Sequence, residues 1–404
     1  MTDTTEAWST LLPERARPLA EPPSTVTHSE GPLRVETLPP VAARQMAVLN
    51  EWFEAAGGAE RVLLATLDVF PTADAYVLWR DPTAHSHHAL RESWLARTPI
   101  RGRKAMTLPL IPFVWRTQTR QPYDVVLSLS HALNHTARFS LREGGIHLSY
   151  VHTPARYLWL PQIDRRHRGV GRRVAVSATK RLERTMSRHV TSYAANSREV
   201  QRRIQQFWGR DSRVIHPPVR THFYSDPPRS VRESSRDYIL GVGRWILYKN
   251  FDFMIDVASR AGVPLVLAGA GPMEAELRRR AGAARVPVTF EVSPSDDRVR
   301  ELMWGARCLL FPCHEDFGIV PVEAQACGTP VVGLGRGGLL ETMIDGETAF
   351  LLPELDVDAF ADRVRAAGKL NPADAQANAQ RFTQQRFAIE IRRWLNDSVP
   401  AGST

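Results

Sequence analysis

The feature that most constrains how this chain can fold is the run PCHEDFGIVPVEAQACGTPVVG from Pro312 to Gly333. Pro321 suits the first turn of a helix and Gly328 suits a left-handed helix end, so we expect a helix of about two turns over Pro321–Cys327. The next residues, Thr329-Pro-Val-Val, predict a short buried strand. Residues typical of a helix start and a helix end, polar side chains and a predicted buried strand thus occur within one short run.

The residues before this predicted helix offer a binding site for an anion. Four of them have backbone N–H groups that no carbonyl of the helix can accept: Phe317, Gly318, Ile319 and Val320. Such N–H groups, at the positive end of the helix dipole, attract phosphate. Glu315 and Glu323 place carboxylates on either side of the same pocket, where they could hold hydroxyl groups. The alternative is a solvated loop residue and a favourable first-turn charge.

The two glutamates, separated by seven residues and flanked by Phe-Gly and Pro-Val-Glu-Ala, resemble a known signature. It belongs to the nucleotide-sugar site of retaining glycosyltransferases of GT-B architecture, in family four (glycosyl transferases group 1). The resemblance implies that Glu315 contacts the donor sugar and Glu323 contacts the ribose of the nucleotide. It also implies two doubly wound, parallel-sheet (Rossmann-like) α/β domains that face each other across a cleft.

The order of the predicted elements agrees with two such domains. The length of 404 residues favours two cores over one, and alternating strand and helix patterns predict parallel sheets. We expect five segments: a disordered or loosely packed, proline-rich arm (1–44), an N-terminal acceptor-binding domain (45–220), a linker (221–236), a C-terminal nucleotide-sugar-binding domain (237–381), and a terminal helix that crosses back to the first domain, with a tail (382–404).

Two glycine turns follow predicted strands and open predicted helices. Gly57 and Gly58, in Gly-Gly-Ala-Glu-Arg-Val, resemble the family's loop that touches the donor diphosphate; without that context, most such pairs are simple turns. Gly269 and Gly271 resemble the loop that passes the nucleotide base, although Ala270 stands where the family often has Asp. The dinucleotide fingerprint is excluded because its three-glycine spacing is absent.

A histidine at the end of a strand is the candidate for the reaction centre. His152 follows the strand Ile146–Val151, and ligands of open α/β sheets bind outside such ends. His-Thr-Pro-Ala-Arg-Tyr closely resembles a segment of family members that build bacterial surface glycans, many of them mannosyltransferases. The alternative for His152 is a buried, hydrogen-bonded histidine. His131 and His135 have the spacing of a shared helix face, but without a third ligand nearby we interpret them as loop or cap residues rather than a metal site.

Two cations mark the start of the predicted second domain. Arg244 lies at the end of the strand that begins at Tyr238, and Lys249 lies just beyond it. A planar guanidinium and a point charge suit a diphosphate that gains negative charge as its sugar leaves. Their spacing matches a pair in the family, whereas isolated cations of this kind are ordinarily solvated. If they serve the diphosphate, no metal ion or other cofactor is required.

The positive charge of the chain is local. Residues 161–215 contain 14 Lys or Arg and 4 Asp or Glu, a local charge of +10 within a total of +9. The resemblance places this region near a lipid-linked acceptor, so we expect it to face an anionic membrane surface; solvated helix faces are the alternative. A non-catalytic nucleic-acid-binding protein is the competing class, but no recognised binding motif accompanies the charges, so no nucleic-acid partner is expected.

Cellular location is inferred from what the sequence lacks. Only three cysteines occur, Cys308, Cys313 and Cys327, and there is neither a secretory signal nor a membrane-spanning run. We therefore expect reduced thiols and a cytoplasmic protein, with peripheral binding to the inner face of the membrane through its basic region as the alternative. The predicted activity is transfer of a hexose, with mannose from GDP-mannose preferred and UDP-glucose or another nucleotide sugar as the alternative, to a hydroxyl of a glycan, glycolipid or lipid-linked acceptor.

Overall fold

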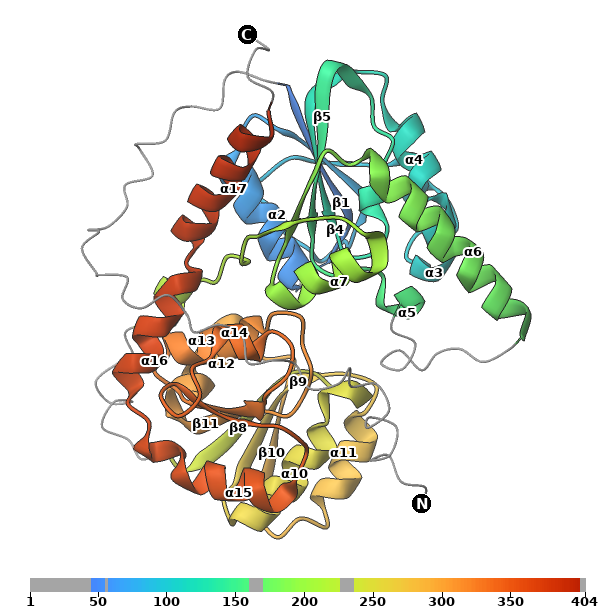
Figure 1. The fold of residues 1–404 in the computed structure, drawn as a ribbon. Coiled ribbons are helices and arrows are strands. Elements are labelled where there is room, and N and C mark those ends of the chain that lie inside the picture. Colours follow the sequence, from blue (N-terminus) through green and yellow to red (C-terminus); the bar gives the residue numbers. More distant parts are fainter. Residues whose placement is uncertain (1–44, 55–56, 160–169, 226–235, 400–404) are drawn as a thin grey trace, which may run out of the picture. The chain divides into compact units, whose positions relative to one another are not determined.

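The computed structural model describes residues 45–54, 57–159, 170–225 and 236–399, which form two parallel β-sheets (Figure 1). The expected N-terminal arm lies outside the described residues, as do residues 226–235 of the expected linker. The linker's first residues are helical, because α8 spans Thr221–Tyr224.

The first sheet has seven strands in the order β3-β2-β1-β4-β5-β6-β7, and every neighbouring pair is parallel. The strands are β1 (Met46–Phe53), β2 (Asp74–Arg80), β3 (Leu90–Glu92), β4 (Tyr123–Ser130), β5 (Leu141–Val151), β6 (Ser192–Ala195) and β7 (Arg213–Val214). All eight residues of β1 are buried, as expected for a central strand covered on both faces.

The second sheet repeats this plan with six parallel strands in the order β10-β9-β8-β11-β12-β13. The strands are β8 (Tyr238–Arg244), β9 (Leu265–Ala270), β10 (Val288–Val292), β11 (Ala306–Phe311), β12 (Val331–Leu334) and β13 (Ala349–Leu352). In both sheets the strand order reverses once, between β1 and β4 and between β8 and β11. Ligands of doubly wound sheets bind at such switch points.

Helices cover both faces of each sheet (Figure 1). In the first half they are α2 (Gly58–Val69), α3 (Lys104–Thr107), α4 (Ile111–Gln118), α5 (Arg156–Trp159), α6 (Val170–Met186) and α7 (Arg198–Trp208). In the second half they are α10 (Phe251–Ala261), α11 (Glu274–Ala281), α12 (Asp296–Gly305), α13 (Ile319–Ala326), α14 (Leu339–Thr342), α15 (Val357–Ala366), α16 (Pro372–Ala379) and α17 (Gln384–Ser398). Among the helices described, none is both long and apolar enough to cross a bilayer.

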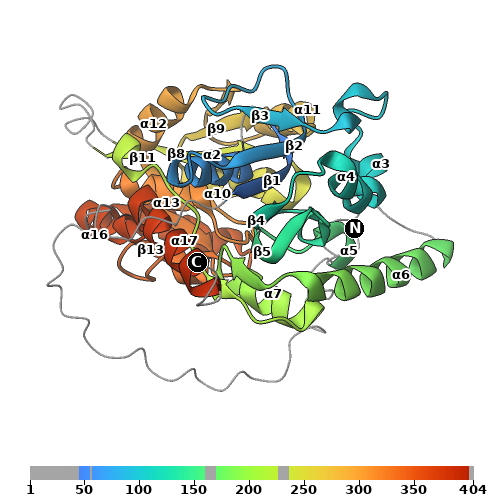
Figure 2. The same ribbon diagram turned by 90° about the horizontal axis from the view of Figure 1, so that it is seen from above.

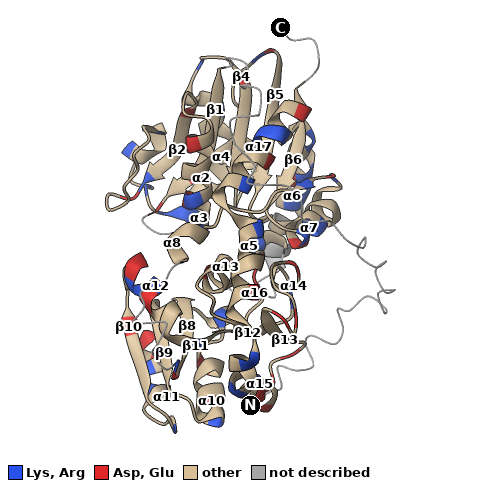
Figure 3. Cartoon of the chain, turned by 90° about the vertical axis from the view of Figure 1, so that its left-hand side faces the viewer, with Lys and Arg blue, Asp and Glu red and all other residues tan. Residues whose placement is uncertain are grey.

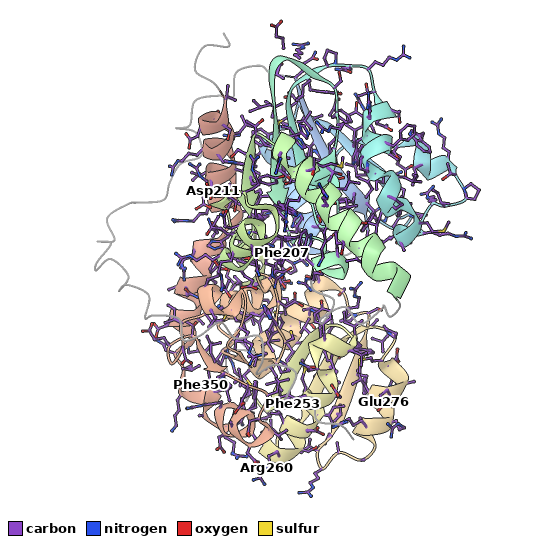
Figure 4. All side chains as sticks on the ribbon, turned by 45° about the vertical axis from the view of Figure 1, so that its right-hand side comes forward. Phe207, Asp211, Phe253, Arg260, Glu276 and Phe350 are labelled. Atoms are coloured by element: carbon purple, nitrogen blue, oxygen red, sulfur yellow. The ribbon has the colours of Figure 1, made fainter. Side chains whose placement is uncertain are left out.

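Side chains from both faces of the second sheet form its cores. Phe253 of α10 packs edge-on against Phe360 of α15, and Phe350 of β13 borders the same cluster (Phe253 and Phe350 are labelled in Figure 4). Cys308, Cys313 and Cys327 are buried free thiols within the two clusters of this half. Burial raises the pKa of Cys308 to about 12, so this thiol stays protonated and unreactive.

Helix α13 differs from its sequence prediction at its start. It begins at Ile319, two residues before Pro321, because Gly318 adopts a left-handed conformation (φ 87°) that ends the preceding loop. Proline is still tolerated in this first turn, where its missing N–H leaves no helical bond unmade. At the other end Gly328 is left-handed (φ 70°), and its N–H donates to the Gln325 carbonyl at 2.8 Å.

Helix α17 brings the end of the described chain to the first sheet. It packs against α2, and four of its side chains join the core formed by β1, β4 and β5: Phe387, Ile391, Trp394 and Leu395. The Trp394 indole N–H also donates to the Ser192 hydroxyl of β6 at 2.9 Å. The last helix therefore completes the hydrophobic core of the first half.

Replacing Trp394 with alanine should destabilise the protein by about 3–5 kcal/mol, because a large side chain that is 2 % exposed would leave a cavity in a packed core. Urea unfolding followed by fluorescence and circular dichroism measures the loss. Arg393→Ala, at an exposed position on the same helix, is the matched control. Equal unfolding midpoints for the two variants would contradict the role assigned to α17.

Candidate functional site

The predicted site residues fall at the switch points of the two sheets. The turn containing Gly57 follows β1, and His131 follows β4 directly. In the second sheet Arg244 is the last residue of β8, and Glu315 lies four residues after β11 ends. Carboxyl ends of parallel strands share one edge of a sheet, so each half presents its candidate groups at the edge where ligands bind.

The glycine turn of the first half lies against the start of α13 in the second. A Cβ atom added to Gly58 would come within 2.8 Å of the Cδ1 atom at the end of the Ile319 side chain, so the two residues lie in direct contact and a larger residue would require this side chain to turn away. Gly57 precedes α2 in an extended conformation. At Gly318 and Ile319 the helix presents N–H groups that lack helical acceptors. The turn and these N–H groups therefore border the same space.

Lys249 and Glu315 meet in the second half. The Lys249 ammonium lies 3.2 Å from a Glu315 carboxylate oxygen, and both side chains are less than a fifth exposed. Burial acts to lower the pKa of Lys249, but the charge of Glu315, a hydrogen bond to it and smaller contributions from Cys313 and Tyr248 together outweigh burial and raise the pKa, so the amine stays charged. Asn250, next in the chain, donates to the Pro312 carbonyl at 2.6 Å and joins the two loops.

A buried carboxylate connects this loop to the first half. Asp316 accepts hydrogen bonds from Arg156 and Arg203, each at 2.5 Å. Burial acts to raise the pKa of Asp316, but the two guanidinium charges outweigh it and lower the pKa to about 2. Arg156 also lies 3.9 Å from Glu315, so the same guanidinium contacts both acids of the loop.

Glu323 faces the first half from within α13. It is 3 % exposed and pairs with Arg61 of α2. Burial raises the pKa of Glu323 in spite of Arg61 and the Tyr224 hydroxyl, which both favour the carboxylate. The residue that the resemblance assigns to the ribose is thus paired with Arg61, which lies in the helix that follows the glycine turn.

His152 is part of a buried polar group at the ends of β1, β4 and β5. Burial lowers the pKa of His152 to about 3, so the ring is neutral at pH 7, and its Nε2 atom is buried with no hydrogen-bond partner among the described residues. The His131 ring lies beside it, with centroids 6.2 Å apart. His131 Nδ1 is 3.0 Å from Glu51, whose carboxylate also accepts backbone N–H groups of the turn after β4.

The pKa of His131 shifts in the opposite direction from that of His152. Burial acts to lower the pKa of His131, but Glu51 outweighs it and raises the pKa. His135 contacts a different acid, Glu183, at 3.4 Å, and its ring stacks on Trp208. The two histidines therefore face separate carboxylates and do not share one helix face: His131 lies in the turn after β4, and His135 lies in a short 3₁₀ helix, Asn134–Thr136.

Three residues predicted to bind the donor, Arg244, Gly269 and Gly271, lie apart from the buried polar side chains around His152. The Arg244 side chain is exposed, and within the described ranges it makes no hydrogen bond or ion pair. Gly269 and Gly271 have a structural reason to be glycine: an added Cβ would lie 1.9 Å from the Gly243 carbonyl oxygen and 2.4 Å from that of Trp245. The close approach at these glycines is to neighbouring backbone, whether or not a nucleotide base also binds there.

A second glycine pair supports the Glu315 loop. An added Cβ at Gly337 would lie 2.3 Å from the Glu315 carbonyl oxygen, and one at Gly338 would lie 2.4 Å from the Phe317 backbone. The Gly338 N–H donates to the Glu315 carbonyl at 2.9 Å. Phe317 itself is buried against His216 and Phe382. The Phe317 side chain therefore anchors the loop, while Gly318, Ile319 and Val320 lie at the helix start.

Sequence reasoning missed most of the residues that hold the site together. They are Glu51, Arg61, His131 as a partner of His152, Arg156, Arg203 and Asp316. Three of them carried a signal, because Arg61 lies in the Gly-Gly-Ala-Glu-Arg-Val segment, Arg156 lies in the same short segment as His152, and Asp316 follows Glu315 directly. The others meet their partners only through the fold.

Part of the chain matches a known protein family. Residues 225–386 match the family described as Glycosyl transferases group 1. The match covers the second sheet and includes Arg244, Lys249, Glu315 and Glu323.

Curated relatives match over part of their length. A D-inositol 3-phosphate glycosyltransferase of Mycolicibacterium paratuberculosis (strain ATCC BAA-968 / K-10) is 34% identical over 185 residues, which are 42% of this chain and 41% of the relative. The alpha-1,3/1,6-mannosyltransferase ALG2 of Rhizomucor pusillus is 25% identical over 224 residues, which are 44% of this chain and 49% of the relative. The chain thus spans less than half the length of each.

Solved structures match over most of the chain. The Anabaena Alr3699/HepE structure in complex with UDP superposes with a TM-score of 0.68 at 19% identity, over 87% of this chain and 100% of that one. Sucrose-phosphate synthase from Thermosynechococcus elongatus gives a TM-score of 0.67 at 20% identity, over 88% and 99%. These likenesses, together with the two parallel sheets, confirm the predicted two-domain, Rossmann-like α/β fold of GT-B type.

Asp316→Asn should destabilise the protein by about 3–5 kcal/mol, because it removes the carboxylate that pairs with the buried Arg203 and the partly buried Arg156. Urea unfolding measures the change. Asp297→Asn provides a control at an exposed ion pair, where a loss within about 1 kcal/mol is expected. If the two variants unfold alike, the Asp316 ion pairs do not support the loop.

Stability should fall as the pH drops below 6.5. Burial lowers the pKa of His135 and His152 to about 3 and that of His147 to about 4, so between these values and 6.5 the unfolded chain binds protons that the folded chain does not. Each histidine contributes a slope of up to about 1.4 kcal/mol per pH unit there. Urea midpoints from pH 7.5 to 4.5 should fall less steeply for His147→Gln than for the wild type, whereas exposed His222→Gln should leave the slope unchanged.

Proposed function

We propose that the chain is a retaining glycosyltransferase that transfers a hexose from a nucleotide diphosphate sugar to a hydroxyl group. The observation that carries the proposal is the meeting of Lys249, Glu315 and the start of α13 with the glycine turn of the first half. The family match over residues 225–386 and the UDP bound in a structural neighbour support a nucleotide-sugar donor.

In the proposed mechanism the second half holds the diphosphate. Its oxygens would accept from the N–H groups of Gly318, Ile319 and Val320, with Arg244 and Lys249 balancing the charge that grows as the sugar leaves. The exposed Arg244 guanidinium is free to turn towards a ligand. Because two cations and helix N–H groups supply this stabilisation, we propose that the reaction needs no metal ion.

The donor would rearrange the Lys249–Glu315 pair. A diphosphate carries more negative charge than one carboxylate, so it would compete for the Lys249 ammonium and release Glu315 to the sugar hydroxyls. Arg156, at 3.9 Å from Glu315, would keep that carboxylate oriented. Glu323 would contact the ribose by exchanging part of its contact with Arg61. His152, neutral and with an unpartnered Nε2, would accept from a hydroxyl of the sugar or acceptor.

Mannose from GDP-mannose is the donor we propose first, since one relative is named a mannosyltransferase and the His-Thr-Pro-Ala-Arg-Tyr segment resembles such enzymes. A UDP-sugar is the second candidate, because a structural neighbour binds UDP-glucose. In either case we propose that Gly269 and Gly271 lie beside the base.

We propose an acceptor that carries phosphate or lies at an anionic membrane surface. Lys and Arg gather on α6 and α7, which lie side by side (Figures 2 and 3). A hollow of ≈ 630 Å³ beside them is lined by Arg184, Arg188, Gln206, Trp208, Gly209 and Arg210. Near it the Phe207 ring of α7, labelled with Asp211 in Figure 4, stacks on Trp159 at 4.7 Å. Peripheral binding at the inner face of a membrane would place this basic surface against lipid phosphate.

Lys249→Met and Glu315→Gln should each lower transfer by on the order of 10²-fold or more, because each removes a group that acts on the reacting centre. The assay measures release of GDP or UDP from GDP-mannose, UDP-glucose and related donors, with thermal shift as the binding readout. Lys369→Met and Glu354→Gln are matched controls at exposed positions of the same half. Unchanged turnover in folded Lys249→Met and Glu315→Gln would contradict the proposed mechanism. If the wild type bound none of the donors, the proposed function itself would be contradicted.

A further inference from the structure

Three metal-binding side chains converge away from the proposed reaction centre. They are Asp68, in the last turn of α2, and His87 and His88, in the loop between β2 and β3. One possible ligand atom from each lies within 4.8 Å of the others, and within the described ranges no other group of three such side chains does so. The two imidazole Nε2 atoms lie 3.0 and 2.9 Å from the same Asp68 oxygen.

The loop folds so that both histidines point the same way. Successive residues of an extended chain point to opposite sides, yet the His87 and His88 rings lie with their centroids 4.1 Å apart. The Ser86 hydroxyl accepts from the His88 N–H at 3.1 Å and donates to the His88 carbonyl at 3.0 Å, which holds this local turn. The ring positions are therefore set by the backbone of the loop.

We propose that Asp68, His87 and His88 bind one divalent transition-metal ion, with Zn²⁺ as the ion of reference. Two imidazole nitrogens and one carboxylate oxygen are ligands that Zn²⁺ uses, at about 2.0–2.2 Å from the ion. Because neighbouring ligand atoms around such an ion are about 3 Å apart, the present spacing needs little adjustment. Three protein ligands leave the remaining position to water, and the side chains of His87 and Asp68, 66% and 52% exposed, give the ion access from solvent.

The ion would join two elements of the first half. It would tie the end of α2 to the loop that leads into the edge strand β3. The helix rises about 1.5 Å per residue, so Asp68 lies roughly 15 Å from the glycine turn at the other end of α2. The site is therefore separate from the groups assigned to sugar transfer, and binding at it is expected to change stability rather than to supply the chemistry of the reaction.

Isothermal titration of Zn²⁺ into chelator-treated, full-length protein without a histidine tag tests the proposal. We expect one equivalent to bind, with affinity at least about tenfold weaker in Asp68→Ala, His87→Ala and His88→Ala, because each removes one of three ligands. Exposed His222→Ala is the matched control and should bind like the wild type. Co²⁺ should give visible d–d absorption that the same three variants lose.

Thermal unfolding gives an independent readout, since an ion that binds only the folded chain stabilises it by mass action. Added Zn²⁺ should raise the unfolding midpoint of the wild type and His222→Ala but not that of the three ligand variants. No stoichiometric binding, or equal binding in the wild type and the ligand variants, would overturn the proposal. Neither result depends on the glycosyltransferase activity.

Discussion

The arrangement of the candidate site depends on the ion pairs of one buried carboxylate, Asp316. Its two oxygens are divided between Arg156 and Arg203, which come from different elements of the first half. A buried carboxylate without partners would be strongly unfavourable, so its position is tied to theirs. Because Asp316 separates Glu315 from Phe317, fixing it also fixes the carboxylate on one side and the aromatic anchor on the other. Lys249 then has a defined acid to contact.

The sequence predicted the parts of the fold that local pattern controls. Glycine and proline positions and apolar runs located the strand before His152, the strand that ends at Arg244 and the helices α13 and α17, with errors of a few residues at the ends. The position of Gly318 explains the error at α13, since its left-handed backbone starts the helix earlier than Pro321 indicates. Lys249 was expected just beyond a strand end and Glu315 beside the helix start, and the structure brings these two side chains together.

What could not be predicted is the pairing of side chains across the chain. Arg156 and Asp316 are 160 residues apart, and Arg203 and Asp316 are 113 apart, so no local spacing contains either pair. The glycines are a second example. A glycine after a strand predicts space for a ligand, yet Gly269 and Gly271 each lie against neighbouring backbone. A close approach by a ligand and a close approach by neighbouring backbone both require glycine, so the sequence alone does not distinguish them.

The position of α17 has a consequence for how the protein is made. Its four buried side chains belong to the core of the first sheet, but a ribosome adds them after both sheets have been synthesised. Domains generally fold in order as they emerge, whereas here the earlier half must wait for the final described helix before its interior is complete. Until then the surface of β1 and α2 that α17 covers stays open to water, and a nascent chain that stalls short of Phe387 would expose it to chaperones.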